Sequence, residues 1–385
     1  MIKRDITSEL ILAAQEYPVV TIIGPRQSGK TTLAKMVFPD YSYCSLEDPD
    51  IREFALNDPR SFLADYSHNV IFDEIQRAPA LLSYLQGMVD KDNSKGRFIL
   101  TGSYQLKLRA EVIQSLAGRT ALLTLLPLSI SELSASGQLK PRDELLYYGA
   151  FPRIYNDNIN PARAYSNYYQ TYVERDVRQL INLKNVSLFE KFLKLLAGRV
   201  GQIINFNSLS NDVGVSNTTL KEWLSVLEAS FIIIKLEPYF ENFGKRVIKS
   251  PKIYFSDTGL LCYLLDIDSA KIVRRDPLIG QIFENLIILE AIKTRLNKGL
   301  SPNIYFFRDS NGVEIDILYK QGAKLTPVEI KSSATFNKAF SKNIHKFQKL
   351  TDNAEKGFIV YAGDFEPKTK AYSVLNFNTC STIFS

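Results

Sequence analysis

Residues 24–32 carry a complete phosphate-loop pattern. They are Gly24, Pro25, Arg26, Gln27, Ser28, Gly29, Lys30, Thr31 and Thr32, which fit G-x-x-x-x-G-K-[ST]. The two glycines let backbone N–H groups surround phosphates, and a helix that starts here adds the positive end of its dipole. Lys30 is placed to contact the β- and γ-phosphates, and the Thr31 hydroxyl is placed to ligate Mg²⁺. The pattern therefore predicts a site for ATP and Mg²⁺.

Two acids follow the next buried apolar run. Asp73 fits the carboxylate that reaches Mg²⁺ through water, and Glu74 fits the base that polarises the attacking water. A third apolar run ends in Thr101-Gly102-Ser103. We expect its strand to lie between the first two, so that Ser103, or alternatively Thr101, orients the water near the γ-phosphate. The alternative for Ser103 is an ordinary turn after a strand.

Arg119 ends a helical stretch just before the apolar run 121–125. An arginine at this edge of the nucleotide domain could reach the γ-phosphate of a neighbouring subunit as an arginine finger. That reading predicts a homo-oligomer, most simply a ring such as a hexamer. The alternative is a surface arginine at the C-terminal end of a helix.

Four charged residues in the C-terminal third form a second constellation. Glu284 lies near the start of a predicted helix, Asp316 on a strand over 313–318, and Glu329 and Lys331 on the next strand. Period-two alternation puts Glu329 and Lys331 on one face. The arrangement resembles the restriction-endonuclease-like (PD-(D/E)xK) fold, in which Asp316, Glu329 and Glu284 would bind Mg²⁺ and Lys331 would activate the nucleophile. The alternative is that these strands expose their charges to solvent.

The elements around these residues indicate an α/β protein with several domains. The β-branched run 19–23 before the loop is typical of a buried parallel strand, and the helix-forming stretch 33–38 follows it. In the middle of the chain, a short helix, a turn at Gly214 and a helix capped by Ser216 outline a helix-turn-helix.

Two strands after that outline, 231–236 and 252–255, would form a β-hairpin wing. Basic residues lie between them at Lys245, Arg246 and Lys249. The predicted recognition helix carries Lys221 balanced by Glu222, so DNA contact is expected mainly through the hairpin. A packing or oligomerisation module is the alternative.

Composition limits the remaining classes of function. The chain has 385 residues, a net charge of +6, 45% apolar residues and 23% charged residues, as in globular proteins of several domains. Three cysteines and two histidines are too few for a zinc cluster. We see no membrane-spanning run and no signal peptide, so we expect a cytoplasmic protein without membrane contact.

Taken in order, the motifs resemble the AAA-superfamily ATPases that carry a C-terminal domain of unknown function, the DUF4143 group. The matching segments include GPRQSGKTT (24–32), VIFDEIQ (70–76), ILTGSYQ (99–105), SLAGRTALLTLLPLSISEL (115–133), GAFPRI (149–154), YVERDVRQL (172–180), KRVIKSPKIYFSDTGL (245–260), VEID (313–316) and VEIKSS (328–333). The resemblance implies that the loop at Gly149 belongs to an ATPase lid.

The resemblance and the patterns together predict four parts. These are a P-loop AAA-type ATPase core with a parallel sheet over 1–130, a helical lid over 131–183, a winged-helix-like domain over 184–258 and a restriction-endonuclease-like α/β domain over 259–385. The expected function is ATP-driven binding or remodelling of DNA, with Mg²⁺-dependent cleavage as a further activity. Two alternatives are a nucleotide-gated signalling or defence switch that binds a partner protein, and a DNA motor with an inactive nuclease fold.

Overall fold

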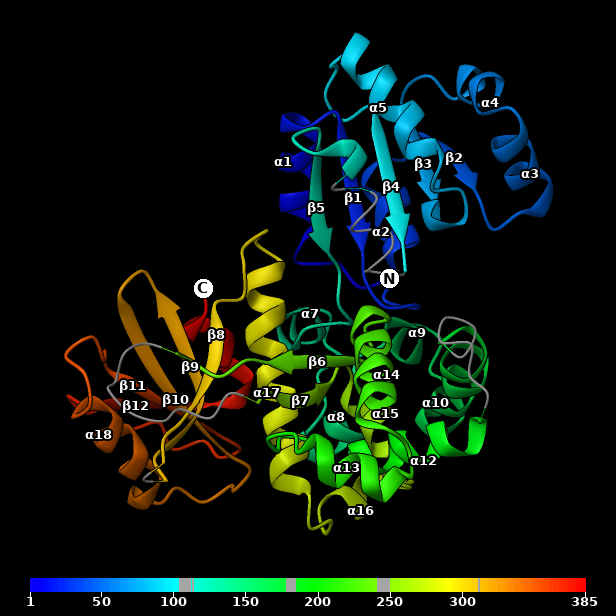
Figure 1. The fold of residues 1–385 in the computed structure, drawn as a ribbon. Helices are drawn as coiled ribbons and strands as arrows, with labels where there is room; N and C mark the ends of the chain where they lie inside the picture. Colours follow the sequence, from blue (N-terminus) through cyan, green and yellow to red (C-terminus); the bar gives the residue numbers. More distant parts are fainter. Residues whose placement is uncertain (104–111, 113, 178–184, 241–249, 311) are drawn as a thin grey trace. The chain divides into compact units, whose positions relative to one another are not determined.

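We describe the chain from a computed structural model, which covers residues 1–103, 112, 114–177, 185–240, 250–310 and 312–385, without the side chains of 174–177. The chain divides into two compact units (Figure 1). Unit 1 comprises Met1–Leu128, Ala229–Phe231 and Leu296–Leu300, and unit 2 comprises Ser129–Glu228, Ile232–Arg295 and Ser301–Ser385.

Unit 1 is built on a five-stranded parallel sheet with the strand order β2-β3-β4-β1-β5. We expected the strand that ends at Thr101-Gly102 to lie between the strand before the phosphate loop and the strand before the acid pair. This prediction is confirmed, because β4 lies between β1 and β3. The elements are α1 (Thr7–Glu16), β1 (Val19–Ile23), α2 (Lys30–Val37), β2 (Ser42–Ser45), α3 (Pro49–Asn57), α4 (Pro59–Asp65), β3 (Val70–Asp73), η1 (Ile75–Arg77), α5 (Leu81–Lys91), β4 (Phe98–Gly102) and β5 (Thr120–Thr124).

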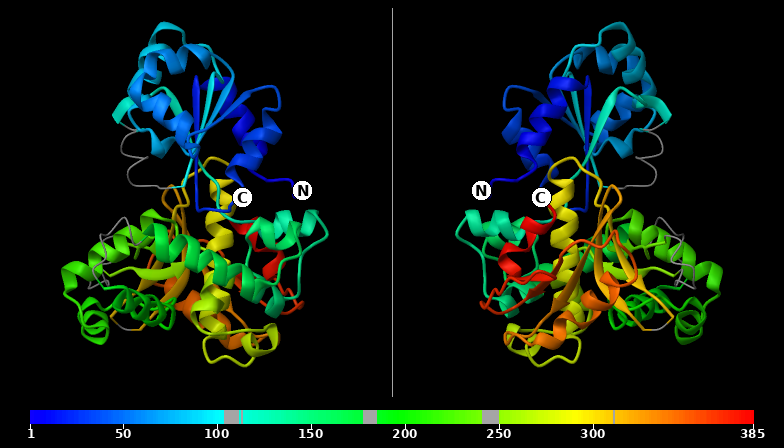
Figure 2. Two further views of the ribbon diagram at one scale, coloured as in Figure 1. Left: turned by 90° about the vertical axis from the view of Figure 1, so that its right-hand side faces the viewer. Right: turned by 90° about the vertical axis from the view of Figure 1, so that its left-hand side faces the viewer.

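Helices cover both faces of this sheet, as Figure 2 shows with the sheet seen nearly edge-on. Alternate residues of the strands divide between the faces. Ile71 and Ile99 belong to the core that α1 and α2 cover. Phe72 lies on the opposite face, where its ring is 5.9 Å from the ring of Phe62 on α4. Asp73, two residues after Ile71, therefore emerges on the α2 face.

Unit 2 begins with helices that surround a small winged-helix arrangement. Ring contacts of Trp223 with Phe189 at 5.2 Å and with Phe192 at 5.4 Å pack α14 against α12. An antiparallel bridge from Ile203 to Lys252 extends the two-stranded β6-β7 sheet. The elements are α7 (Ile130–Ala135), α8 (Arg142–Tyr148), α9 (Pro152–Asn156), α10 (Pro161–Tyr168), the π-helix η2 (Tyr169–Val177), α12 (Val186–Ala197), α13 (Phe206–Val213), α14 (Asn217–Ala229), β6 (Ile233–Leu236), β7 (Lys252–Phe255), α15 (Thr258–Leu264) and α16 (Ala270–Val273).

The rest of unit 2 is a mixed five-stranded sheet with the order β12-β11-β10-β9-β8. Strands β8, β9 and β10 run antiparallel to their neighbours in that group, whereas β11 pairs parallel with both β10 and β12. The elements are α17 (Ile279–Leu296), β8 (Ile304–Arg308), β9 (Glu314–Gln321), β10 (Lys324–Lys331), η3 (Lys338–Ser341), α18 (Lys342–Gln348), β11 (Gly357–Tyr361), β12 (Tyr372–Asn376) and η4 (Phe377–Ile383).

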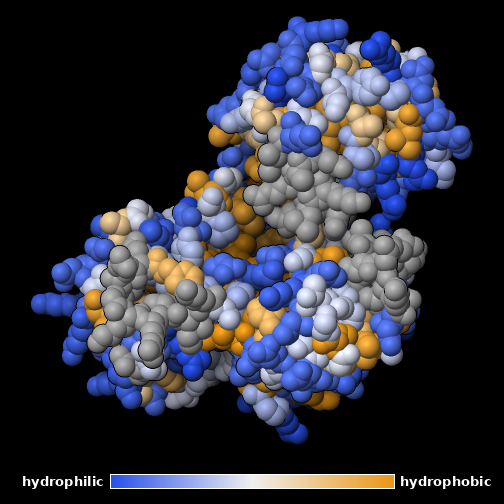
Figure 3. Space-filling view, viewed as in Figure 1, coloured by the Kyte–Doolittle hydropathy of each residue, from blue (hydrophilic) through white to orange (hydrophobic). Residues whose placement is uncertain are grey.

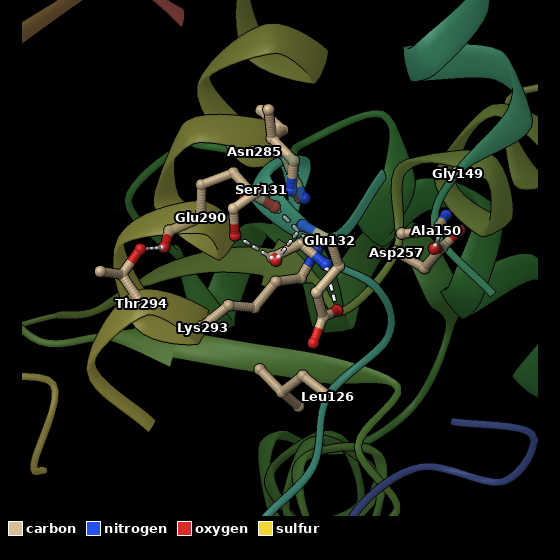
Figure 4. Close-up of polar contacts among 12 residues, drawn as sticks. Leu126, Ser131, Glu132, Gly149, Ala150, Asp257, Asn285, Glu290, Lys293 and Thr294 are labelled. Atoms are coloured by element: carbon tan, nitrogen blue, oxygen red, sulfur yellow. Dashed lines mark hydrogen bonds and ion pairs between the residues drawn. The ribbon is translucent and has the colours of Figure 1, made fainter. Parts of the chain in front are cut away.

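Polar side chains of α17 hydrogen-bond to the backbone of α7 and of β7 within unit 2, in the region drawn in Figure 4. The Glu290 carboxylate accepts the N–H of Ile130 at 2.7 Å, at the start of α7, and pairs with Lys293 at 2.9 Å. The Asn285 side chain accepts the N–H of Phe255 at 2.7 Å and donates to its carbonyl at 2.8 Å. Because Phe255 ends β7, this amide pair fixes the register of α17 against that strand.

On the face shown in Figure 3, the described residues are mostly hydrophilic, with several small groups of hydrophobic residues among them. None of the helices in the part of the chain that the structure describes has both the length and the apolar character needed to cross a membrane.

Candidate functional sites

The phosphate loop lies where β1 ends and α2 begins, and its glycines are required by the backbone. Gly29 has a φ of +92°, in the left-handed region that side chains rarely adopt. At Gly24 a Cβ atom would collide with the carbonyl oxygen of Leu125, just after β5. These two glycines therefore permit the sharp turn and its close approach to the neighbouring strand.

The Lys30 side chain is folded back onto the loop. Its Nζ donates to the carbonyl oxygens of Gly24 at 3.1 Å and Pro25 at 2.8 Å. Burial lowers the pKa of Lys30 to about 8, although the charges of Glu74 and Asp73 oppose that shift. A phosphate at this position would restore a full charge partner to the ammonium group.

The other loop residues differ in their exposure and in their partners. Arg26 forms an ion pair with Glu47 at 3.7 Å. Gln27 is exposed and has a φ of +63°, and Thr32 is exposed at the start of α2. The Ser28 hydroxyl is buried and has no hydrogen-bond partner among the described residues. A buried hydroxyl next to the loop is suited to bind an incoming polar ligand.

Asp73 is held by three hydroxyl groups. Thr31 Oγ1 donates to Asp73 Oδ1 at 2.9 Å, and Thr101 donates to the same oxygen. Tyr43 on β2 donates to Oδ2 at 2.8 Å. Burial and this hydrogen bond raise the pKa of Tyr43 to about 12. The Thr31 hydroxyl and the Asp73 carboxylate together present the hard oxygen groups that Mg²⁺ prefers, so the residues fit the predicted ion.

Glu74 begins a sharp turn after β3, with a φ of +55°. Its Oε1 accepts a hydrogen bond from Ser103 Oγ at 2.9 Å, and its other oxygen accepts one from the Gln76 amide. The backbone N–H of Glu74 points to the Thr101 hydroxyl at 3.4 Å. Both candidates for orienting the water thus contact the acid pair: Ser103 donates to Glu74, and Thr101 donates to Asp73.

Arg119 lies in the turn immediately before β5. Its guanidinium donates to both carboxylate oxygens of Asp90, at 2.5 and 3.0 Å, and to the carbonyl of Ala117 at 3.1 Å. The hydrogen bond with Asp90 raises the pKa of Arg119. The side chain is about one third exposed, so another chain has access to it.

A second cluster of charges lies on α17, β9 and β10 of unit 2, and it brings together the four residues predicted from the sequence. Lys331 Nζ is 2.7 Å from Glu329 Oε2 and 3.5 Å from Asp316 Oδ2. The N–H of Ile330 also donates to Asp316 at 2.8 Å. The charges of Asp316 and Glu329 outweigh burial and raise the pKa of Lys331. Glu284 contributes to the same shift from α17.

Residues of β7, which sequence analysis missed, complete this cluster. Lys252 is 3% exposed and pairs with Glu284 at 3.2 Å and with Glu314 at 2.8 Å. Tyr254 donates to Glu284 at 2.5 Å. The sequence shows these two side chains only as alternate positions of a short strand, with no spacing that relates them to α17 or β9.

The negative charges of the carboxylates in this cluster are neutralised mainly by the ammonium groups of Lys252 and Lys331. Burial and the nearby Asp316 raise the pKa of Glu329 to about 8. Asn343 lies close to Glu329, but Oε1 of this carboxyl receives no hydrogen bond of good geometry among the described residues. In the described ranges no three Asp, Glu, His or Cys side chains come together as a ready-made metal site. Metal binding here would require the Lys331 ammonium to move.

The described part of the winged-helix arrangement includes the predicted recognition helix, α14. On α14 the exposed positions include Lys221 and Glu222, and the Lys221 ammonium lies 5.4 Å from the Phe206 ring. The basic residues of the predicted wing, Lys245, Arg246 and Lys249, lie outside the described residues.

Comparisons with known proteins assign the parts of the chain. Residues 16–134 match the family model described as an AAA domain, and residues 140–271 and 279–380 match domains of unknown function, DUF8612 and DUF4143. An uncharacterised protein of Mycobacterium tuberculosis (strain ATCC 25618 / H37Rv), Rv2008c, is 32% identical over 337 residues, which cover 86% of this chain and 74% of the relative. The chain belongs to this family of AAA-domain proteins with a DUF4143 domain.

More distant similarities are found to another uncharacterised protein and to solved structures. An uncharacterised protein of Haemophilus influenzae is 24% identical over 287 residues, covering 71% of this chain and 67% of the relative. Among solved structures, the Walker-type ATPase PABY2304 of Pyrococcus abyssi is 13% identical with a TM-score of 0.46, covering 69% of this chain and 96% of that chain. AMPPCP-bound DnaA from Aquifex aeolicus is 15% identical with a TM-score of 0.29, covering 58% of this chain and 85% of that chain. The family assignment rests on the domain matches and the mycobacterial relative.

Proposed function

We propose that this protein hydrolyses ATP. The observation that carries the proposal is the hydrogen bond between Thr31 and Asp73, which joins the start of α2 to the end of β3. This hydrogen bond supports a single site that combines the phosphate loop with Asp73, and Glu74 follows Asp73 directly at the end of β3. That combination provides both nucleotide binding and a base for water.

Each group has a distinct task in this reaction. The backbone N–H groups of the loop and the Lys30 ammonium bind the phosphates, and Thr31 and Asp73 would hold Mg²⁺. When bound, Mg²⁺ supplies positive charge to the β- and γ-phosphates. Glu74 accepts a proton from the attacking water, and Ser103 holds the Glu74 carboxylate in place through its 2.9 Å hydrogen bond.

The experiment is a titration with a fluorescent ATP analogue in the presence of Mg²⁺. Lys30→Ala removes the phosphate-binding ammonium and should weaken binding by at least tenfold, because charge-assisted contacts contribute about 1.5–3 kcal/mol. Lys91→Ala, at the exposed end of α5, is the matched control and should bind like the wild type. Equal affinities of Lys30→Ala and wild type would contradict the assignment.

We further propose that the active form is a homo-oligomer, with Arg119 serving the nucleotide site of an adjacent subunit. The exposure of this side chain supports the proposal. The ion pair with Asp90 would have to open when the arginine turns to a neighbouring phosphate. An arginine in trans neutralises charge that develops on the γ-phosphate in the transition state.

We propose DNA as the substrate on which ATP hydrolysis acts. The winged-helix arrangement of α13, α14, β6 and β7 supports this, as does the net charge of +6. ATPase rates with single-stranded, duplex and branched DNA test it. Stimulation by any of them supports a DNA-dependent enzyme, whereas equal rates with and without DNA favour the alternative, a nucleotide-gated switch that binds a partner protein.

Cleavage of DNA by the C-terminal cluster is a separate proposal. The proximity of Asp316, Glu329 and Lys331 on adjacent strands supports it. The acidic groups are, however, paired with lysines, and this supports the alternative of an inactive nuclease fold that only binds. Lys252 pairs with Glu284 and Glu314, and Lys331 pairs with Asp316 and Glu329. The two hypotheses predict different results: an active nuclease cleaves DNA when Mg²⁺ or Mn²⁺ is added, whereas an inactive fold does not.

A further inference from the structure

Tyr43 contacts the nucleotide site without belonging to any of its motifs. It lies on the edge strand β2, whose parallel register pairs Ser45 with Asp73. Residues 43 and 45 therefore share the face on which Asp73 emerges, and the long phenol reaches forward to the carboxylate. Its hydroxyl donates to Asp73 Oδ2 at 2.8 Å, while the hydroxyls of Thr31 and Thr101 occupy Oδ1.

These three donors determine what Asp73 has left for a ligand. A carboxylate can accept about four hydrogen bonds, two at each oxygen. Counting donors from the described residues, Oδ1 accepts two hydrogen bonds and Oδ2 accepts one, which leaves one acceptor position on the oxygen that Tyr43 contacts. With both oxygens bonded, the carboxylate cannot rotate without losing a donor.

The phenol is itself held by the phosphate-loop helix. The Lys35 ammonium of α2 lies 3.2 Å from the centre of the Tyr43 ring, a cation–π contact. Lys35 follows Thr31 by one helical turn. The same helix therefore orients Asp73 twice, directly through Thr31 and indirectly through the Tyr43 ring.

We propose that Tyr43 is a positioning residue for Mg²⁺, because its hydrogen bond fixes the Asp73 carboxylate with one acceptor position left that would serve the ion. This inference rests on the proposed function and deepens it. It assigns the Mg²⁺ dependence of nucleotide binding partly to a side chain on β2, outside the phosphate loop and the acid pair.

The test compares Tyr43→Phe with Tyr41→Phe in the full chain. Tyr41 loses an equivalent hydroxyl that donates to the carbonyl of Gly96 at 2.8 Å, away from Asp73. A fluorescent, slowly hydrolysed ATP analogue is titrated at a series of Mg²⁺ concentrations and in EDTA. For Tyr43→Phe we expect the half-saturating Mg²⁺ concentration to rise about three- to tenfold, as for the loss of one orienting hydrogen bond. Binding in EDTA should be unchanged, which also shows that the variant is folded.

The outcomes separate this inference from the proposed function. If the wild type binds the analogue equally well with Mg²⁺ and in EDTA, the Mg²⁺ site itself is wrong and the proposed function fails with it. If the wild type depends on Mg²⁺ and Tyr43→Phe matches Tyr41→Phe within twofold, only the role of Tyr43 is overturned. A Tyr43→Phe variant that loses binding in EDTA as well would make the residue structural and would also overturn it.

Discussion

Replacement of Glu74 by glutamine should separate ATP binding from ATP hydrolysis. The glutamine has the same shape, but it cannot accept a proton from water. In the wild type, the Glu74 carboxylate accepts hydrogen bonds from Ser103 and from the Gln76 amide. A glutamine keeps one carbonyl acceptor for Ser103, and its new amide donor needs an acceptor nearby.

Gln76 can provide that acceptor. Its Oε1 is buried and has no hydrogen-bond partner among the described residues, so a rotation of this amide would let it accept from the new side chain. The side chain at position 74 then still makes two hydrogen bonds, as in the wild type. We therefore expect a change in folding stability of less than about 1 kcal/mol, the value of a typical net hydrogen bond.

The chemical step loses much more. Removal of a general base lowers rates by about 10²–10⁴-fold, which corresponds to roughly 2.7–5.4 kcal/mol in the activation free energy. Phosphate release at saturating ATP should fall by this factor in Glu74→Gln, while the dissociation constant for a fluorescent ATP analogue should stay within threefold. Glu53→Gln, an exposed position on α3, is the matched control and should keep the wild-type rate.

Two results would refute this reasoning. A rate of Glu74→Gln within threefold of wild type would mean that another group activates the water. A loss of nucleotide binding as large as that in Lys30→Ala would mean that Glu74 holds the loop rather than acting on water.

The remaining predictions concern pH, assembly and cleavage. Since the pKa of Lys30 is lowered to about 8 in the free site, nucleotide affinity should be constant below pH 8 and fall by up to tenfold per pH unit above it, because the ammonium loses its proton. The Lys30→Met variant should bind weakly at every pH and show no such decline. An equal decline in Lys30→Met would exclude Lys30 as its cause. Arg119→Ala and Glu74→Gln subunits, each inactive alone, should partly recover ATPase activity when mixed, because some interfaces then contain one intact site; full activity of Arg119→Ala alone, or no recovery in assemblies shown to be mixed, argues against an arginine in trans. Asp316→Ala should abolish any Mg²⁺- or Mn²⁺-dependent DNA cleavage and leave the ATPase rate unchanged. Cleavage is measured on single-stranded, duplex and branched DNA, with and without ATP. If the wild type cleaves none of these and Asp316→Ala has the same DNA affinity, the C-terminal fold is an inactive one used for binding.

The sequence by itself predicted the strand, the loop and the helix start of the candidate nucleotide site, and the structure has these elements at those residues. Chemistry and backbone geometry there depend on neighbours in the chain, so a strand, a loop with glycine at 29 and a helix starting at 30 are visible as a continuous pattern. The alternation of the C-terminal strands likewise predicted that Glu329 and Lys331 share a face, and they are 2.7 Å apart. Period and spacing carry this kind of information because they are local.

Only the tertiary structure decided which distant residues support these sites. Tyr43 reaches Asp73 through the pairing of β2 with β3, and Lys252 reaches Glu284 because Asn285 fixes α17 against the end of β7. Sheet order, strand register and helix docking create these contacts between residues roughly 30 positions apart, and no local pattern in the sequence encodes them. A tyrosine or lysine in a short strand has no chemical assignment until its neighbours in space are known.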